Sequence, residues 1–334
     1  MKRILILSVL FFSCALHAQD IHFTQFYASP ITLNPALTGA NSGTYRIAAI
    51  YRNQWSSVTV PFQTMGLSFD TKLLESKMKT NVLGTGLSFV GDRSGDGKLT
   101  MIDIKLSAAY HKSLGEKMML GLGVQGGYVS KSINYTALRF PNQFTGTDFD
   151  ITLPNLEPVS GKNPGYMDLN AGLLFGYKPS AKVNTFIGYS FNHITNPKET
   201  FLGGLNKLSS RQSAHLGAEI ALNDKFGIQP NIIYQYQSKA SELNLGTALT
   251  YNLDFGSKPA VAGFGVWYRL KDALAFVPSL EWNSLRLGFA YDVNLSQLNA
   301  ASHSRGAYEI SLIYIGKLNT VSVPKSYQYP CPRM

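Results

Sequence analysis

The residues best able to do chemistry in this sequence are charged side chains that recur at alternate positions of extended segments. The acidic ones are Asp103, Asp168, Glu219, Glu281 and Asp292, and the basic ones are Arg46, Arg52, Lys105, Arg269 and Arg286. Two neighbouring carboxylates could serve as a general acid and base, or could narrow a pore. Carboxylates beside cations instead form ion pairs. We favour ion pairs that fill an interior, although a single sequence does not say which residues pair.

The segment from Gly91 to Gly97 is a second candidate, because Asp92 and Asp96 lie among glycines. Such spacing could provide carboxylate ligands for calcium, but the later bidentate glutamate of an EF-hand loop is missing. A hairpin turn built on Asp96-Gly97 is the simpler interpretation. We therefore predict a turn here and no metal site.

Histidines and nucleophilic side chains give no stronger indication of a catalytic or metal-binding site. His111, His193 and His215 fall in or near extended segments, without the spacing of a helical zinc site. They are better explained as interior polar residues than as ligands. The chain also lacks a G-x-S-x-G elbow and a phosphate-binding loop. The sequence therefore predicts no enzyme activity, no catalytic or metal-binding residue and no cofactor.

The composition indicates what kind of structure positions these side chains. Charged residues make up 15% of the chain, compared with about 25% in typical soluble proteins. Aromatic residues reach 12% and glycines number 30, while the mean hydropathy is −0.03. Outside the N-terminus, no segment approaches the ~18 apolar residues that a transmembrane helix needs. These features favour strands with one apolar and one polar face.

Alternation of apolar and polar residues runs along the whole chain. Leu173 and Phe289 fall on the apolar faces of their segments, whereas Gly172 and Asn294 fall on the opposite faces. A soluble β-sandwich also alternates, but here the apolar stretches are long and aromatic residues recur at their ends. In lipid every backbone group must be paired, so such a sheet has to close on itself. We predict an all-β, antiparallel, up-and-down transmembrane β-barrel.

Counting the alternating segments gives about fourteen strands. They are 44–52, 62–71, 81–91, 98–111, 118–131, 166–178, 182–194, 212–222, 225–238, 241–253, 259–270, 273–282, 285–295 and 307–316. The longest gaps, from Ser132 to Gly165 and from Thr195 to Arg211, follow odd-numbered segments. Long extracellular loops after odd strands and short periplasmic turns after even strands are typical of bacterial barrels. Both ends of the barrel domain, 44–316, are then expected in the periplasm.

The N-terminus has the pattern of a secretory signal peptide, residues 1–18. Lys2 and Arg3 precede a short apolar run, and small residues lead to a cleavage position after Ala18. A lipoprotein signal ending at Cys14 is an alternative, but the residues before it match poorly. Cleavage after Ala18 leaves Cys331 as the one cysteine, so an internal disulfide is not expected.

The formal net charge is +10, and it falls to +8 when Lys2 and Arg3 are removed with the signal peptide (28 basic minus 20 acidic residues). The basic residues are scattered and form no single patch, so we predict no nucleic-acid partner. The remaining charge fits a wet lumen, anionic lipid headgroups or an acidic partner.

Segments flank the predicted barrel on both sides. Residues 19–43 contain Pro30 and Pro35, which rule out one regular helix. Their position before the first strand suggests a periplasmic segment. It could also plug the barrel or bind a partner in an extended conformation. Residues 317–334 are expected to form a periplasmic C-terminal tail.

Three blocks carry a resemblance to a known family. The chain reads DIHFTQFYASPITLNPALTG at 20–39, YRNQW at 51–55, and YEISLIYIG from Tyr308 with a final CPRM from Cys331. In this order after a signal peptide, they resemble the PorP/SprF family of type IX secretion system membrane proteins of Bacteroidetes. The match is densest before the first strand. It suggests candidate partner-binding residues: Phe23, Gln25, Tyr27, Asn34, Pro35, Arg52, Trp55 and Cys331.

The resemblance implies a multi-pass protein of the Gram-negative outer membrane that belongs to the secretion and gliding motility apparatus. It implies help in the export or surface attachment of a cargo, often an adhesin, that carries a type IX C-terminal signal. The implied partners are that cargo, periplasmic ring components of the machine and the lipid bilayer. The alternatives are a channel or transporter for small or lipophilic solutes, which suits the fold equally well, and an outer-membrane acyl hydrolase, for which no nucleophile arrangement is recognisable.

Overall fold

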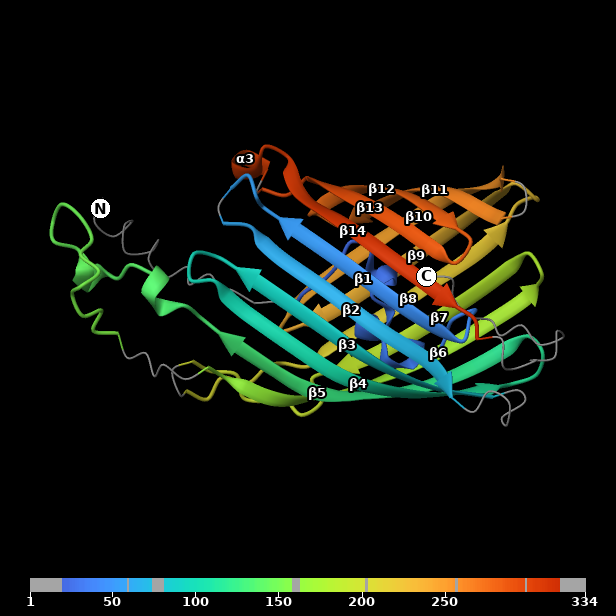
Figure 1. Ribbon diagram of the computed structural model, residues 1–334, viewed down its shortest axis with the longest axis horizontal. Helices are drawn as coiled ribbons and strands as arrows, with labels where there is room; N and C mark the ends of the chain where they lie inside the picture. Colours follow the sequence, from blue (N-terminus) through green and yellow to red (C-terminus); the bar gives the residue numbers. More distant parts are fainter. Residues whose placement is uncertain are drawn as a thin grey trace, which may run out of the picture.

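A computed structural model describes residues 20–58, 60–73, 81–157, 163–201, 204–255, 258–297 and 299–318. The chain forms one closed antiparallel barrel in which each strand pairs with its sequence neighbours (Figure 1). The strands are β1 (Tyr45–Gln54), β2 (Phe62–Leu73), β3 (Val82–Ser94), β4 (Leu99–Ser113), β5 (Met118–Ser132), β6 (Gly165–Ser180), β7 (Val183–Asn192), β8 (Arg211–Ala221), β9 (Phe226–Gln237), β10 (Ala240–Phe255), β11 (Lys258–Arg269), β12 (Ala273–Trp282), β13 (Leu285–Asn294) and β14 (Arg305–Gly316). The predicted fold and strand number are confirmed.

The barrel closes where β1 meets β14. Their register runs without a shift from Tyr45 opposite Gly316 to Gln54 opposite Ala307. β1 pairs along its whole length with β2 on its other side. Both edges of the sheet are therefore satisfied, as a hydrocarbon environment requires.

The two ends of the barrel differ. The loops after odd-numbered strands lie at one end, which we call the long-loop end, and include 133–164 and 193–210. The turns after even-numbered strands lie at the other, the short-turn end, where β1 begins and β14 ends. The loop between β5 and β6 extends well away from the barrel, and its short helices are η3 (Tyr135–Ala137) and η4 (Pro141–Gln143) (Figure 1). The predicted contrast between long and short connections is present.

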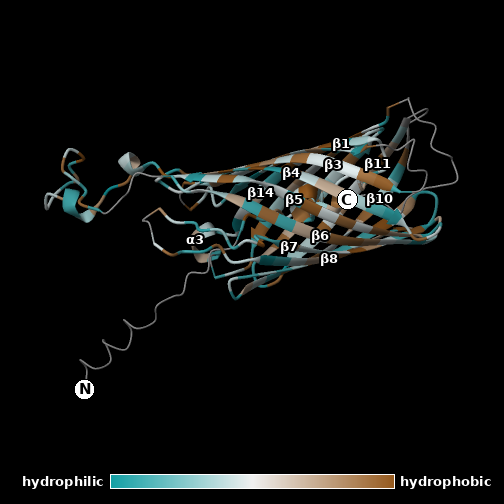
Figure 2. Ribbon diagram, turned by 90° about the horizontal axis from the view of Figure 1, so that it is seen from below, coloured by the Kyte–Doolittle hydropathy of each residue, from teal (hydrophilic) through white to brown (hydrophobic). Residues whose placement is uncertain are grey.

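Apolar and polar residues alternate along the strands (Figure 2). Leu173 and Phe289 are 47% and 44% exposed on the outer face, as expected for side chains that meet lipid. Gly172 and Asn294 are buried on the inner side. Aromatic rings pair near both ends of the barrel, and aromatic girdles at both interfaces are typical of membrane barrels. These pairs are Tyr45–Tyr314, Phe226–Tyr251, Tyr51–Tyr308 and Trp55–Phe62.

The segment before β1 lies inside the barrel, so its expected placement as a free periplasmic segment is wrong. Its described residues, 20–43, are called the plug from here on. Pro30 and Pro35 each begin one of its short helices, α2 (Pro30–Leu33) and η2 (Pro35–Leu37), which follow η1 (Phe26–Ala28). Leu37 and other plug residues join the main buried apolar cluster with wall residues such as Trp267. Burial of this apolar surface against distant strands outweighs solvation in the periplasm.

The plug does not fill the whole lumen. A cavity of about 960 Å³ remains between the plug and the short-turn end. Another short helix, α3 (Asn299–Ser302), lies in the loop between β13 and β14. Among the described residues, no helix has the length and apolar character needed to cross a membrane.

We expect an arginine on the outer face to destabilise the barrel far more than one in the cavity. Leu173→Arg or Phe289→Arg places a charge in lipid, which costs roughly 2–4 kcal/mol near the bilayer midplane. Thr250→Arg is the control, because Thr250 lines the cavity. Urea unfolding in lipid vesicles measures the loss. An equal loss for all three variants would mean that the faces are assigned incorrectly.

Candidate functional site: the plug and its docking wall

Asn34 is the main polar contact between the plug and β6–β8. Its Oδ1 accepts a hydrogen bond from the Ala36 backbone at 2.9 Å, which caps η2. Its Nδ2 lies 2.9 Å from the Leu173 carbonyl oxygen and 3.1 Å from Nε2 of His215. Asn34 is fully buried. One side chain therefore shapes the plug and also fixes it to the wall.

Glycines on the wall make this close approach possible. A Cβ atom on Gly123 of β5 would overlap the Pro35 carbonyl carbon and the Ala36 nitrogen. A Cβ atom on Gly172 of β6 would overlap Oδ1 of Asn34. The backbone of η2 thus rests directly on the backbone of the wall, which any larger residue would prevent.

A buried ion pair holds the next part of the plug. Arg46 of β1 donates from Nε to Asp70 of β2 at 2.9 Å and from Nη2 to the Leu37 carbonyl oxygen at 2.9 Å. Asp70 also accepts from the Gly39 backbone nitrogen at 2.8 Å. The charges neutralise each other while their remaining hydrogen-bonding capacity is used by the plug backbone.

A larger set of charges, the Arg52 cluster, holds the plug near Thr24. It consists of Arg52, Arg269, Asp292 and Glu309, all at most 4% exposed. Arg52 contacts Glu309 at 2.5 Å and Asp292 at 3.2 Å. Arg269 contacts Asp292 at 2.9 Å.

The acidic members of this cluster bind the plug directly. Glu309 accepts hydrogen bonds from the backbone nitrogens of Thr24 at 2.7 Å and Gln25 at 2.9 Å. Asp292 accepts one from the Thr24 hydroxyl at 2.9 Å. Charge-assisted bonds of this kind are stronger than neutral ones. The carboxylates are therefore engaged in binding the plug and the arginines.

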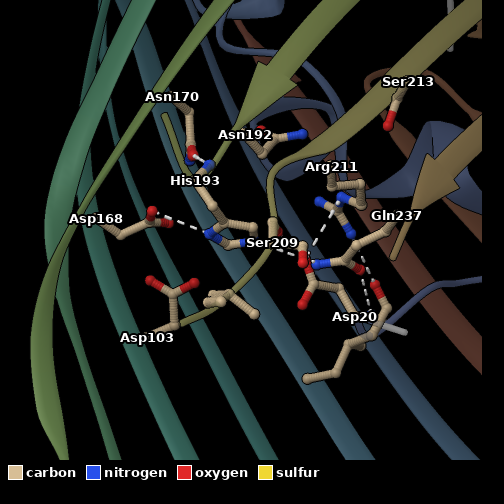
Figure 3. A network of polar contacts seen from close by, with 12 residues as sticks. Asp20, Asp103, Asp168, Asn170, Asn192, His193, Ser209, Arg211, Ser213 and Gln237 are labelled. Carbon is tan, nitrogen blue, oxygen red and sulfur yellow. Dashed lines mark hydrogen bonds and ion pairs between the residues drawn. The ribbon is translucent and has the colours of Figure 1, made fainter. Parts of the chain in front are cut away.

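The first described residue, Asp20, lies in a polar network at the long-loop end (Figure 3). His193 follows β7 and contacts Asp20 through Nε2 at 2.6 Å and Asp168 through Nδ1 at 2.9 Å. Arg211 lies 3.6 Å from Asp20, and Lys105 lies 2.9 Å from Asp168. The plug therefore runs from the long-loop end to the start of β1 at the short-turn end.

The protonation of His193 follows from this geometry. Burial alone would lower the pKa of His193, but the hydrogen bonds and charges of Asp168 and Asp20 outweigh it and raise the pKa to about 9. Burial also opposes ionisation of Asp20, yet Arg211 and His193 bring its pKa well below the usual range. With both ring nitrogens bonded to carboxylates, His193 is a charged link and not a general base.

The ion-pair interpretation of the inner charges is confirmed for these clusters and for Arg286 with Glu281. Sequence reasoning missed Asp70 and Glu309, although both occupy inner positions of alternating segments. The segment around Asp92 forms the expected turn, at 95–98 between β3 and β4. Within the described residues, no group of three or more His, Cys, Asp or Glu side chains could hold a metal ion.

The candidate partner-binding residues differ in how deeply they are buried. Those buried in the lumen are Phe23, Gln25, Asn34, Pro35 and Arg52. The half-buried Tyr27 packs on Trp267, with ring centroids 5.6 Å apart. The half-buried Trp55 packs against Phe62 at the long-loop end, and Cys331 lies outside the described residues. The structure thus brings most of them together to hold the plug.

Comparison with known proteins adds two findings. A family model described as "Type IX secretion system membrane protein PorP/SprF" matches residues 15–314. Among proteins with curated descriptions, no sequence matches this chain.

Solved structures share the architecture. The Pseudomonas putida toluene transporter TodX is 12% identical, with a TM-score of 0.50, covering 85% of this chain and 92% of its own. The CymD monoaromatic hydrocarbon channel is 13% identical, with a TM-score of 0.49 over 87% and 93% of the two chains. At such low identities the likeness concerns the barrel fold alone.

Enlarging Gly123 should loosen the plug. We expect Gly123→Val to cost about 1–3 kcal/mol of docking free energy through overpacking, raising the undocked population by about five- to 150-fold. Single-channel conductance in planar bilayers should increase accordingly. The control is Gly126→Val on the same strand, where the added group meets the flexible end of Leu169 instead of plug backbone. Equal conductance of both variants would contradict the docking geometry.

The Asp20 end of the plug should undock at alkaline pH. Because the pKa of His193 is raised from 6.5 to about 9, its stabilisation is complete below pH 6.5 and is lost as the pH rises through about 9. Hydrogen exchange at 20–24, corrected for the chemical rate, should accelerate across this range. In His193→Gln exchange should already be fast below pH 6.5 and should show no such step. A native protein without the step would refute this assignment.

Proposed function

Because the chain belongs to the PorP/SprF family of type IX secretion system membrane proteins, we propose that it acts as a closed outer-membrane platform for a secreted protein. The barrel is a membrane component of the secretion apparatus, and a closed antiparallel barrel is the fold by which proteins span the bacterial outer membrane. In this proposal it assists the export or surface attachment of a cargo with a type IX C-terminal signal. Adhesin anchoring and gliding are the roles that fit such a cargo.

The orientation of the barrel follows from its connections. Bacterial membrane barrels have short periplasmic turns and longer extracellular loops. The long-loop end, with 133–164 and 193–210, is then outside the cell, and the short-turn end faces the periplasm. In a Gram-negative envelope, the platform offers the cargo its outer loops and offers the periplasmic ring its turns and the tail that contains Cys331.

The observation that carries this proposal is the plug itself. Its contacts lie on several sides of the barrel wall. They are the Arg52 cluster on β1, β11, β13 and β14, His215 on β8, and Asp70 on β2. A cargo chain could cross this lumen only if these buried contacts broke together. A surface-binding role needs no such rearrangement, and the many charge-assisted bonds oppose one.

The outer loop 133–164 has the properties of a binding surface. Its described part is organised by its own hydrogen bonds, including Gln143 Nε2 to the Leu153 carbonyl oxygen at 3.0 Å. Several large apolar side chains nevertheless stay exposed: Phe144, Phe149, Ile151, Leu153 and Leu156. Exposed apolar groups gathered on a monomer surface commonly mark protein interaction sites. We propose that the cargo covers them.

We expect deletion of the gene to abolish surface display of one or a few cargo proteins while uptake of small solutes stays normal. Complementation with Phe144→Ser/Leu156→Ser should restore display only weakly, by about tenfold less than the native gene, since interface anchors dominate binding. Whole-cell immunolabelling measures display. The control, Leu205→Ser, changes an exposed leucine on the other long loop. Normal display with loss of a nutrient's uptake would instead support the solute-channel alternative.

A further inference from the structure

The cavity at the short-turn end has the size of a ligand site. Its volume of about 960 Å³ lies near the top of the range of roughly 300–1,000 Å³ that ligand pockets span. Its inner end is lined by plug residues Gln25 and Tyr27 and by Trp267 of β11. Its lining also includes the exposed residues Lys182 and Lys317, beside the short turns and after β14. The cavity therefore opens at the end that faces the periplasm.

Two buried donors at the inner end lack an acceptor in the described part of the chain. They are Nε2 of Gln25 and Nε1 of Trp267, on side chains that are 0% and 2% exposed. The Oε1 atom of Gln25 is already used by the Ser311 hydroxyl at 2.8 Å, which fixes the orientation of the amide. Buried donors are almost always paired. A ligand with carbonyl-like oxygens would satisfy both donors beside the rings of Tyr27 and Trp267.

The charge of the cavity identifies the ligand further. Its lining has five cationic residues, Lys72, Lys178, Lys182, Arg286 and Lys317, and two acidic ones, Glu219 and Glu281. The balance is 5 − 2, or +3. Arg286 and Glu281 pair with each other at 2.8 Å, and the exposed Lys182 and Lys317 belong to the cationic majority at the mouth of the cavity. A cleft lined by one sign of charge concentrates ligands of the opposite sign.

We propose that this cavity is a periplasmic docking site for an extended, acidic polypeptide segment of a partner protein. Backbone carbonyl oxygens of the segment accept from Gln25 and Trp267, while its acidic side chains lie among the lysines. The inference rests on the proposed role in protein secretion, which makes a polypeptide the relevant anion. The chain's own tail is a poor occupant, because after Leu318 it contains Lys325 and Arg333 and no acidic side chain.

The test uses the full-length barrel in detergent and three fluorescein-labelled decapeptides, (Glu-Ala)5, (Gln-Ala)5 and (Lys-Ala)5. Fluorescence polarisation should show the acidic peptide binding about tenfold more tightly than the neutral one, and the basic peptide not binding. Lys182→Glu/Lys317→Glu should weaken the acidic peptide by about tenfold, since each reversed rim charge contributes a modest factor. Both lysines are exposed, so the variant should fold.

The matched control is Lys98→Glu/Lys271→Glu, which makes the same charge change at exposed positions of the long-loop end. It should bind like the native protein. A second variant, Trp267→Phe, removes one donor and should weaken the acidic peptide several-fold while preserving the discrimination between peptides.

Equal binding of all three peptides, or equal loss in the rim variant and its control, would overturn the proposal. An acidic oligosaccharide that binds as tightly as the acidic peptide would overturn the polypeptide assignment. These outcomes are separate from the proposed function. If cells without the gene display cargo normally while the purified barrel still binds the acidic peptide, the platform role fails and the docking site stands.

Discussion

The structure depends on one constraint: in lipid, every backbone hydrogen bond of the sheet must be made within the sheet. Closing β1 on β14 satisfies it, but a barrel of this size encloses a lumen wider than its own wall side chains can fill. The plug is the consequence. Its residues bring apolar groups such as Leu37 to the interior, and its backbone needs partners there, which the inner charges and polar side chains of the wall provide.

These buried charges determine where the plug lies more than they add to the free energy of folding. Burying an ion pair gains little overall, whereas removing one partner of such a pair typically costs about 3–5 kcal/mol. The Arg52 cluster joins four strands to Thr24 and Gln25, so it specifies where the plug lies. The wall glycines also fix the position of the plug, because Gly123 and Gly172 leave room for the backbone of η2. The cavity at the short-turn end is therefore a fixed feature of the lumen.

Local periodicity was enough to predict much of the fold. Alternation identified the strands, placed Leu173 and Phe289 outside, and indicated that the inner charges form ion pairs. Alternation could not predict which charged residues pair, because partners such as Arg46 and Asp70 meet only through cross-strand register. Asp70 and Glu309 lie opposite Arg46 and Arg52 on neighbouring strands, so the parity of their positions is the signal that could have identified them. The sequence does not distinguish a plug from a periplasmic segment or an extended partner-binding segment, because the contacts of the plug come from strands far away in the sequence. The same distance hid the role of Asn34, whose partners Leu173 and His215 lie well over a hundred residues away.

Whether the barrel works with its plug in place is the central question, and a disulfide lock answers it most directly. The hydroxyl oxygens of Thr38 and Ser107 are 3.0 Å apart, so a Thr38→Cys/Ser107→Cys pair in a Cys331→Ser background is close enough to bridge plug and wall. Cargo display should be the same for the oxidised and reduced pair and for each single cysteine. Display that is lost on oxidation and restored by reductant would show that the plug must leave, and would contradict the closed platform.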